Sequence, residues 1–334
     1  MEWTLAYWLP LIFAGLMGLA ILIYVVLDGF DLGVGILMAR TEVGERDRMI
    51  AAIGPFWDAN ETWLVLGVGL LLVAFPVAHG IVLGALYLPT ALLLAGLILR
   101  GVAFDFRAKA QDKHKRLWDH AFFCGSLLAA LAQGYMLGLY ILGFAGGWPS
   151  HIFAVLTAVM LAGGYAFIGA CWLIIKTEGH LQRRAIGWAR GASWLTGAGI
   201  VAVSLATPLV SPRIFGKWFE LPNLLVLAPV PVVTAVLFIW VEVLLRRMSS
   251  APDRGAARPF ACAVGIFVLS FAGLAYSFYP FVVPDRLTLW QAAAAPDSLL
   301  FILVGVIIVL PMILGYTAFS YYVFRGKARD LTYY

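Results

Sequence analysis

Long apolar segments, separated by short polar ones, run along the whole chain. Uncharged stretches occupy residues 3–27, 62–99, 120–175, 191–212, 221–241, 259–284 and 298–324. A membrane-spanning helix needs about 20 mainly apolar residues, so the stretches 62–99 and 120–175 are too long for one crossing. The first contains Pro76 to Gly80 and the second contains Gly146 to Ser150, and Gly/Pro clusters of this kind are typical of turns. Each of these two stretches is therefore predicted to form two helices.

The pattern predicts an all-α polytopic membrane protein with nine transmembrane helices and a single integral membrane domain over 1–334. The helices are expected at roughly 5–38, 52–75, 81–104, 118–144, 152–175, 192–210, 222–245, 259–281 and 297–324. We interpret them as two four-helix bundles plus one peripheral helix. Tyr24 and Thr41-Glu42 near the end of the first helix recur as Tyr165 and Thr177-Glu178 near the end of the fifth. This echo suggests parallel four-helix repeats at about 5–144 and 152–281, followed by the last helix at about 297–324.

The distribution of basic residues predicts the orientation. The segments near 39–51, 105–117, 176–190 and 246–258, the tail and Arg100 hold all but three of the 23 Lys and Arg residues. The three exceptions are Arg213, Lys217 and Arg286. With nine spans, every basic loop falls on one side of the membrane. The positive-inside rule then places the N-terminus outside and the C-terminus in the cytoplasm.

Composition excludes several classes of protein. Hydrophobic residues make up 63% of the chain and charged residues 12%, whereas a soluble domain is nearer half apolar and a quarter charged. The net charge of +5 comes from loop residues that set orientation, so it does not predict nucleic-acid binding. The three cysteines lie inside apolar runs without metal-like spacing. No phosphate-binding loop, dinucleotide-binding fingerprint or catalytic triad is present in the sequence.

Carboxylates in or beside the apolar segments are the main candidates for function. Asp28 and Asp31 lie in the first segment, and Asp58 and Glu61 lie near the start of the second. Each pair is spaced i, i+3 and so shares a helix face. At 1.5 Å per residue, Asp28 and Asp58 are expected at a similar depth, roughly 15–18 Å along their helices from the loop near 39–51. Four carboxylates are therefore expected to face one another near the cytoplasmic side.

A carboxylate in hydrocarbon costs several kcal/mol unless it is paired, protonated or hydrated. The cluster is therefore interpreted as a proton path made of Asp58, Asp28, Asp31, Asp105 and Glu61, with Trp57, Arg100 and Asn60 in support. The simpler alternative is that Asp31 or Asp58 only pairs with Arg100 and so fixes helices together. Three acids next to loops are expected to be solvated helix ends: Asp105, Asp119 and Glu242.

Haem or metal ligation by this chain is not predicted. A haem between membrane helices needs axial ligands, commonly His or Met, within the spans. All five histidines fall in loops or at helix ends: His79, His114, His120, His151 and His180. Mid-span methionines such as Met17, Met136 and Met160 are more typical of packing. A proton-handling membrane chain without a redox centre of its own implies a partner.

Four ordered motifs resemble a known family. They are Asp28-Gly29-Phe30-Asp31-Leu32-Gly33-Val34-Gly35, then Phe56-Trp57-Asp58-Ala59-Asn60-Glu61-Thr62-Trp63, then Arg100-Gly101-Val102-Ala103-Phe104-Asp105-Phe106-Arg107, then Leu117-Trp118-Asp119. In this order they resemble the smaller subunit, subunit II, of cytochrome bd-type quinol oxidases. The close resemblance covers about the first 120 residues, and the remainder is similar in length, helix count and hydropathy. The short loops are similar to the cyanide-insensitive branch.

The resemblance implies a subunit of a terminal quinol:dioxygen oxidoreductase of the respiratory chain, in the bacterial inner (cytoplasmic) membrane. It implies a heterodimer with a haem-bearing subunit I that holds haem b558, haem b595 and haem d, and it allows small accessory single-helix subunits. Subunit II of this family can also hold a structural quinone, whose site the sequence does not place. By motif, Asp58, with Asp28 and the segment from Arg100 to Asp105 nearby, would line a cytoplasmic proton-uptake path at the subunit interface.

Two alternatives from other functional classes remain open from the sequence. A proton-coupled secondary transporter would explain the carboxylates, but transporters usually place a substrate site at the midplane between broken helices. A quinone-binding membrane anchor subunit would need a quinone pocket near one membrane edge. A haem-containing partner would distinguish the oxidase subunit from both alternatives.

Overall fold

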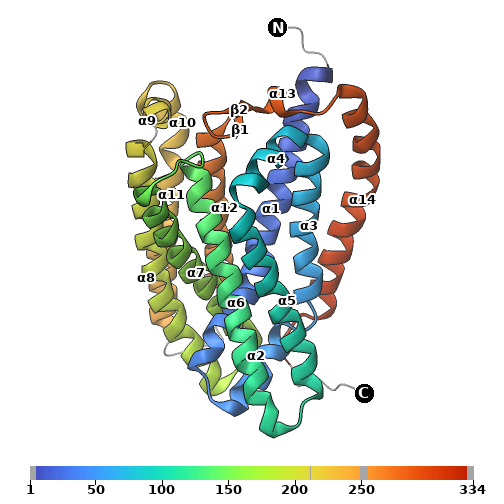
Figure 1. Cartoon of the computed structure of the whole chain (residues 1–334). Coiled ribbons are helices and arrows are strands. Elements are labelled where there is room, and N and C mark those ends of the chain that lie inside the picture. The colour runs from blue at the N-terminus through green and yellow to red at the C-terminus, as the bar shows by residue number, and fades with distance from the viewer. Residues whose placement is uncertain (1–4, 211, 249–254, 329–334) are drawn as a thin grey trace.

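The structure is a computed structural model that describes residues 5–210, 212–248 and 255–328. It is a helical bundle whose long helices run roughly parallel to one axis (Figure 1). In chain order the helices are α1 (Leu5–Leu37), α2 (Val43–Ile53), α3 (Trp57–Ala74), α4 (Pro76–Ala85), α5 (Tyr87–Lys109), α6 (Asp112–Ile141), α7 (Trp148–Lys176), α8 (Gly179–Val210), α9 (Pro212–Phe219), α10 (Asn223–Leu227), α11 (Pro229–Met248), α12 (Ala257–Phe278), α13 (Leu289–Ala292) and α14 (Pro296–Val323). A short 3-10 helix, Met38–Arg40, follows α1. The strands β1 (Phe281–Val283) and β2 (Leu287–Thr288) pair antiparallel as a hairpin before α13.

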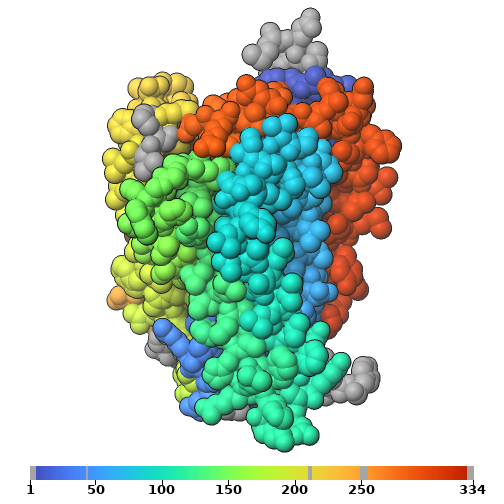
Figure 2. All heavy atoms as spheres, viewed as in Figure 1, coloured from blue at the N-terminus to red at the C-terminus, as the bar shows by residue number. Residues whose placement is uncertain are grey.

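Eight helical segments within the described residues are long and apolar enough to cross a membrane, and α2 with α3 forms a ninth if that bent pair is one span. The prediction of an all-α polytopic membrane protein is therefore confirmed. The two-bundle arrangement, the four-helix repeats and the orientation of the termini stay predictions. Of the described residues of α14, only Leu299 is buried. The side chains of this helix form the right edge of the molecule in Figure 2.

The second predicted helix, at 52–75, is wrong at its start. The chain instead forms α2 and α3, which meet at an angle of 47° across Gly54, Pro55 and Phe56. Proline has no backbone N–H to continue a helix ladder, and glycine favours irregular backbone. The depth estimate for Asp58 assumed a continuous helix across this point and therefore does not apply.

Several other boundaries differ from the sequence prediction. The helix predicted at 81–104 is divided at Leu86 between α4 and α5, and α6 begins at Asp112 rather than at 118. Pro76 to Gly80 form the start of α4 rather than a turn, because proline at the first helical position loses no hydrogen bond. The actual break falls one residue earlier, at Phe75. Helix α8 begins at Gly179 rather than at 192, because residues 181, 185, 186 and 189 form a buried apolar stripe at helical spacing. The expected turn at Gly146 to Ser150 is confirmed up to Gly147, after which α7 begins.

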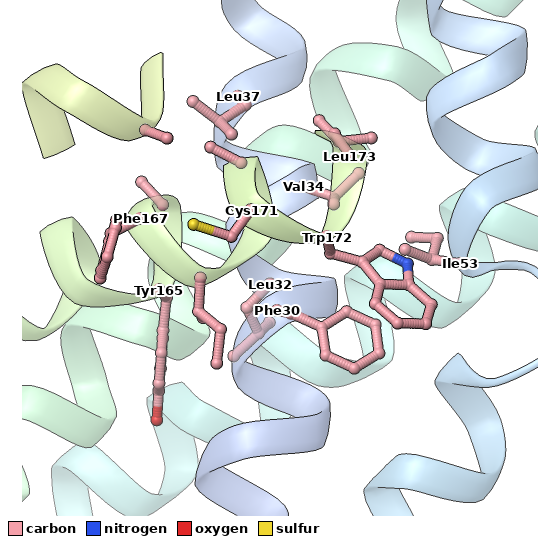
Figure 3. Packing of buried hydrophobic residues seen from close by; sticks show 14 of the residues in the cluster. Phe30, Leu32, Val34, Leu37, Ile53, Tyr165, Phe167, Cys171, Trp172 and Leu173 are labelled. Carbon is pink, nitrogen blue, oxygen red and sulfur yellow. The ribbon is translucent and has the colours of Figure 1, made fainter. Parts of the chain in front are cut away.

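The centre of the bundle is the contact between α1 and α7. A side chain on Gly33 would overlap the backbone carbonyl of Tyr165, and one on Gly169 would approach the backbone of Gly33 to 2.7 Å. These two glycines therefore allow the backbones of α1 and α7 to pack closely. Beside this contact, the rings of Phe30 and Trp172 stack with centroids 4.4 Å apart (Figure 3), and the Trp172 indole donates to the carbonyl of Ala52.

The two ends of the bundle differ in charge. We call the end that carries α2, the α5–α6 connection and the start of α8 the basic end, because the basic segments lie there. It is the lower end in Figure 1. The opposite end carries α4, α9, α13 and the hairpin, with Arg213, Lys217 and Arg286. Arg254 and Arg329, which contributed to the orientation prediction, lie outside the described residues. The prediction places the basic end in the cytoplasm.

Candidate functional site

Helices α1 and α5 bring an aspartate and an arginine together inside the bundle. Asp28 on α1 and Arg100 on α5 are both fully buried, and Arg100 Nη1 donates to Asp28 Oδ1 at 2.7 Å. These two residues are 72 positions apart in the chain. A buried charge is tolerated when a partner of opposite charge satisfies it at hydrogen-bonding distance. The Asp28–Arg100 pair therefore forms the core of the candidate site.

Helix α3 adds a second carboxylate to the same guanidinium. Glu61 Oε1 lies 3.2 Å from Arg100 Nη2, and the Glu61 side chain keeps 25% of its surface exposed. The ring of Trp57, one turn earlier on α3, lies 5.7 Å from the Arg100 guanidinium carbon. An indole face at this distance attracts a cation. Arg100 is thus held by two carboxylates and one aromatic ring.

Asp31 lies one turn after Asp28 and has a neutral partner. Asn60 Nδ2 donates to Asp31 Oδ2 at 2.7 Å, and Asn60 Oδ1 accepts from the hydroxyl of Tyr321 on α14 at 3.1 Å. The same amide nitrogen lies 3.4 Å from the carbonyl of Leu27. Asn60 on α3 therefore connects the buried carboxylate of Asp31 on α1 to Tyr321 on α14.

The charges in this group do not balance. The group holds three carboxylates and one guanidinium, which contacts two of them, and Asp28, Asp31 and Arg100 are fully buried. Asp28 Oδ2, Asp31 Oδ1 and Arg100 Nε have no hydrogen-bond partner among the described residues. Buried carboxylates that repel one another and lack full hydrogen bonding favour a shared proton. We call Asp28, Asp31, Glu61 and Arg100 the acid-rich cluster.

Two of the predicted site residues lie outside this cluster. Asp58, in the first turn of α3, and Asp105, near the end of α5, are both exposed. Neither forms an ion pair within the part of the chain that the structure describes. The segments that carry them are adjacent, because Trp57 packs on Phe104 with centroids 4.9 Å apart. The expectation of four carboxylates facing one another is therefore met by three, with Asp58 at the surface beside them.

Sequence reasoning missed a polar chain on the other side of Asp28. Gln133 Nε2 on α6 donates to the hydroxyl of Tyr24 at 2.8 Å, and the hydroxyl of Tyr165 donates to Gln133 Oε1 at 2.6 Å. Tyr24 lies one turn before Asp28 on α1. The sequence did hold a signal, because a glutamine in the middle of an apolar helix needs partners.

Asp119 belongs to a second cluster, at the basic end. Its carboxylate accepts from Arg46 Nη1 at 2.9 Å and from Arg107 Nε at 2.5 Å, and Arg107 Nη1 also donates to Asp47. The expectation of a solvated helix end is wrong for Asp119, which is 4% exposed, because α2 folds back over it. It is also wrong for Glu242, whose side chain is 17% exposed between Arg190 and Arg246. Asp105 is the one of the three that is exposed.

Potential ligands for a haem or metal are dispersed. Within the described residues, no group of three or more His, Cys, Asp or Glu has the geometry to hold a metal ion. His151 in the first turn of α7 bonds to the hydroxyl of Tyr135 at 2.6 Å. Met136 packs against Thr90, and Met160 packs against Gly199. His151 is thus engaged with Tyr135, and Met136 and Met160 contact neighbouring helices.

Comparison with known proteins gives consistent results. The family described as cytochrome bd terminal oxidase subunit II matches residues 9–324. The chain is 29% identical to cytochrome bd ubiquinol oxidase subunit 2 of Bacillus subtilis (strain 168) over 327 residues, covering 90% of this chain and 91% of that one. It is 28% identical to cytochrome bd-I ubiquinol oxidase subunit 2 of Escherichia coli (strain K12) over 363 residues, covering 93% of each.

The fold has a solved counterpart. The structure of bd oxidase from Geobacillus thermodenitrificans contains a chain that superposes with a TM-score of 0.73 at 17% identity, covering 95% of this chain and 98% of that chain. At this level of identity the superposition establishes the fold alone. The family match extends over nearly the whole sequence and includes all four motifs. The chain therefore belongs to the cytochrome bd terminal oxidase subunit II family.

Proposed function

We propose that this chain is the smaller subunit of a membrane-bound quinol:dioxygen oxidoreductase and that it delivers protons from the cytoplasm to the reaction. Family membership and the names of the two relatives support the oxidase assignment. The apolar helices support a multi-pass membrane location, and we propose the bacterial inner membrane. The acid-rich cluster is the observation that carries the proton role.

The redox groups of such a complex fit the partner rather than this chain. We propose that subunit I holds haems b558, b595 and d, as the resemblance to the bd oxidase family implies, and that this chain ligates none of them. When bound there, the haems supply the electron transfer and oxygen chemistry. This chain contributes the surface that supports subunit I and the side chains that carry protons.

The proposed path begins at the exposed carboxylates. Asp58 and Asp105 lie on adjacent segments at the ends of α3 and α5 nearest the basic end. Anionic groups at a membrane surface attract and exchange protons with water. Glu61 follows Asp58 by one turn on the same helix and is partly exposed. It therefore connects the surface to the buried residues.

The buried part of the path is the acid-rich cluster itself. In this proposal a proton passes from Glu61 to Asp28 beside Arg100, whose guanidinium contacts both carboxylates. Asp31 and Asn60 form a second branch towards Tyr321. The permanent charge on Arg100 stabilises the deprotonated carboxylates, while the excess of acids over bases favours holding one proton among them. The cluster can thus accept and release a proton without moving helices.

The test uses single substitutions in the complex purified from its native membrane. Asp58→Asn and Glu61→Gln should each slow quinol-driven oxygen consumption about a hundredfold, the lower end of what a positioned proton-transfer group contributes. The two subunits and the haem spectrum should remain intact. Asp112→Asn is the matched control, because Asp112 is 96% exposed at the same end and pairs only with Lys115 among the described residues.

Wild-type rates of oxygen consumption and of membrane charging in both path variants would remove the proton role. If the reduced-minus-oxidised spectrum lacks haem bands both in the extracted complex and in native membranes, the oxidase assignment itself would be contradicted. That result would favour a proton-coupled transporter or a quinone-binding anchor subunit.

A further inference from the structure

An open pocket of about 450 Å³ lies at the end opposite the basic end. It is formed by α9, the start of α10, the end of α12 and β1, which lie together near the top of Figure 1. The lining combines two cations with aromatic and amide groups: Arg213, Lys217, Asn223, Tyr276, Tyr279 and Phe281. Nothing in the proposed proton path uses this pocket.

The two cations share one face of α9, because Arg213 and Lys217 are spaced i, i+4. The Arg213 guanidinium lies 4.7 Å from the ring centroid of Phe281. Its Nε donates to Asp285 Oδ1, and its Nη1 lies 3.3 Å from the carbonyl of Ser277. Its Nη2 is buried and has no hydrogen-bond partner among the described residues. Arg213, which lines the pocket, therefore keeps Nη2 as a donor nitrogen that no described residue satisfies.

Lys217 has no acidic partner among the described residues. Its Nζ donates to the carbonyls of Tyr276 and Tyr279 at 2.6 Å and 2.5 Å, and it lies 4.5 Å from the ring centroid of Tyr276. Burial, and then the nearby charge of Arg213, lower the pKa of Lys217 from its ordinary value. An ammonium group has three donors, so one N–H remains for an anion. An anion beside Lys217 would also offset the repulsion from Arg213.

The carboxylates near the pocket compensate only one of the two cations. Asp285 is engaged with Arg213 Nε and is half exposed. Glu220, just after α9, makes no ion pair with Arg213 or Lys217 in the described part of the chain. Asn223 contributes a neutral amide, whose Oδ1 accepts from the hydroxyl of Tyr276 at 3.2 Å. The pocket therefore presents more positive than negative charge.

The surroundings of the pocket are apolar and exposed. Helix α9 connects the membrane-spanning helices α8 and α11, and Phe215, Phe219 and Leu221 around it are 52%, 54% and 72% exposed. Aromatic and basic side chains at a span boundary are typical of the membrane interface, where lipid phosphates lie. Acyl chains of a bound lipid would cover these apolar side chains.

We propose that this pocket binds a phosphate group, supplied by the headgroup of a membrane phospholipid, through Arg213 Nη2 and Lys217 Nζ. A free phosphate ion shares the chemistry, but it would leave the adjacent apolar surface uncovered. The site is independent of the proton path, so the failure of either proposal leaves the other intact.

The experiment counts phospholipids that remain bound to the purified complex in a non-ionic detergent, by native mass spectrometry and phosphorus analysis. The wild-type complex should retain one phospholipid that the Arg213→Gln/Lys217→Gln double variant loses. Arg286→Gln is the matched control, because Arg286 is exposed at the same end but does not line the pocket. It should retain the lipid.

A second variant tests the pocket without substituting a residue of α9, in case the double variant misfolds. Asn223→Asp keeps the acceptor for Tyr276 and adds one negative charge to the pocket. It should lose the same lipid and bind inorganic phosphate about tenfold more weakly, because like charges repel at this range. Oxygen consumption should stay at the wild-type rate. Lys217→Arg keeps the charge and should retain the lipid.

The sources of phosphate are separated by adding inorganic phosphate to delipidated complex and measuring binding by equilibrium dialysis. Phosphate binding that depends on Arg213 and Lys217, with equal lipid counts in all variants, would overturn the lipid headgroup as the source. Equal lipid counts and equal phosphate binding in wild type, the double variant and Asn223→Asp would overturn the proposal as a whole.

Discussion

The acid-rich cluster and the cluster around Asp119 are both built from carboxylates and arginines, but they differ in the balance of negative and positive charge. Around Asp119, two arginines meet two aspartates, and the described contacts satisfy both Asp119 oxygens. Around Arg100, one arginine contacts two carboxylates while a third, Asp31, has no ion partner among the described residues, and buried oxygens of Asp28 and Asp31 are left without partners. A balanced group of ions fixes helices to one another. An unbalanced, buried group has reason to exchange protons.

The largest effect is expected from removing the only guanidinium of the acid-rich cluster. Arg100→Met leaves Asp28 buried without its ion partner, which should destabilise the complex by about 3–5 kcal/mol. Arg107→Met should cost less, about 1.5–3 kcal/mol, because Asp119 keeps its contact with Arg46. Thermal unfolding of the purified complexes measures both.

A charge-matched rescue separates lost charge from lost packing. Adding Asp28→Asn and Glu61→Gln to Arg100→Met removes the unpaired acids and should recover most of the stability, but not the oxygen consumption. If the triple variant is as unstable as Arg100→Met alone, packing rather than charge balance distinguishes the two clusters.

Single substitutions in the two clusters are expected to affect different properties, stability around Asp119 and turnover around Arg100. Asp119→Asn should lower stability by about 1.5–3 kcal/mol, because both arginines lose a charged acceptor. Oxygen consumption per assembled complex should remain near wild type. Glu61→Gln should show the opposite, with slow turnover and small loss of stability. Equal losses of turnover in the two variants would show that both clusters conduct protons, or that neither does.

A smaller effect is expected at the edge of the acid-rich cluster. Tyr321→Phe removes the donor to Asn60 Oδ1 and should destabilise the complex by about 1 kcal/mol. The freed amide can rotate away from Asp31, so turnover should fall modestly. Unchanged turnover at the same loss of stability would make Tyr321 structural and confine the proton path to Glu61 and Asp28.

The smallest effect is expected at the partly exposed pairs of the basic end. Arg184→Gln breaks the contact with Glu45 and should cost about 0–1 kcal/mol. This difference should shrink further at high salt, whereas the effect of Arg100→Met should not, because buried pairs are screened much less. Salt dependence of equal size in both variants would mean that water and ions reach Arg100.

The sequence predicted the members of the acid-rich cluster better than their pairing. Asp28, Asp31, Glu61 and Arg100 stand out because each is a charged residue in an apolar helix. Which carboxylate meets Arg100 depends on how three helices rotate about their axes, and no local pattern encodes that. The sequence therefore suggested Asp31 or Asp58 as the partner, and the structure has Asp28 and Glu61.

Other differences arise from contacts distant in sequence. The burial of Asp119 depends on α2 folding back at Pro55, and the role of Asn60 depends on Tyr321, 261 residues away. The presence of eight candidate spans, or nine if α2 and α3 form one, followed from hydropathy because length and composition decide it. The breaks at Phe75 and Leu86 did not, because neither residue is a strong helix breaker.

The separation of 72 residues between Asp28 and Arg100 has a consequence for how the protein is made. At ordinary rates of translation, α1 is synthesised about 4–14 seconds before α5. During that interval Asp28 lacks the guanidinium of Arg100 that it contacts in the folded protein. The first helix must therefore wait, with its carboxylates neutral or sheltered by the insertion machinery, until the third long span arrives. Biogenesis of this chain should depend on a chaperone that holds early spans, and yield should fall first when that chaperone is depleted.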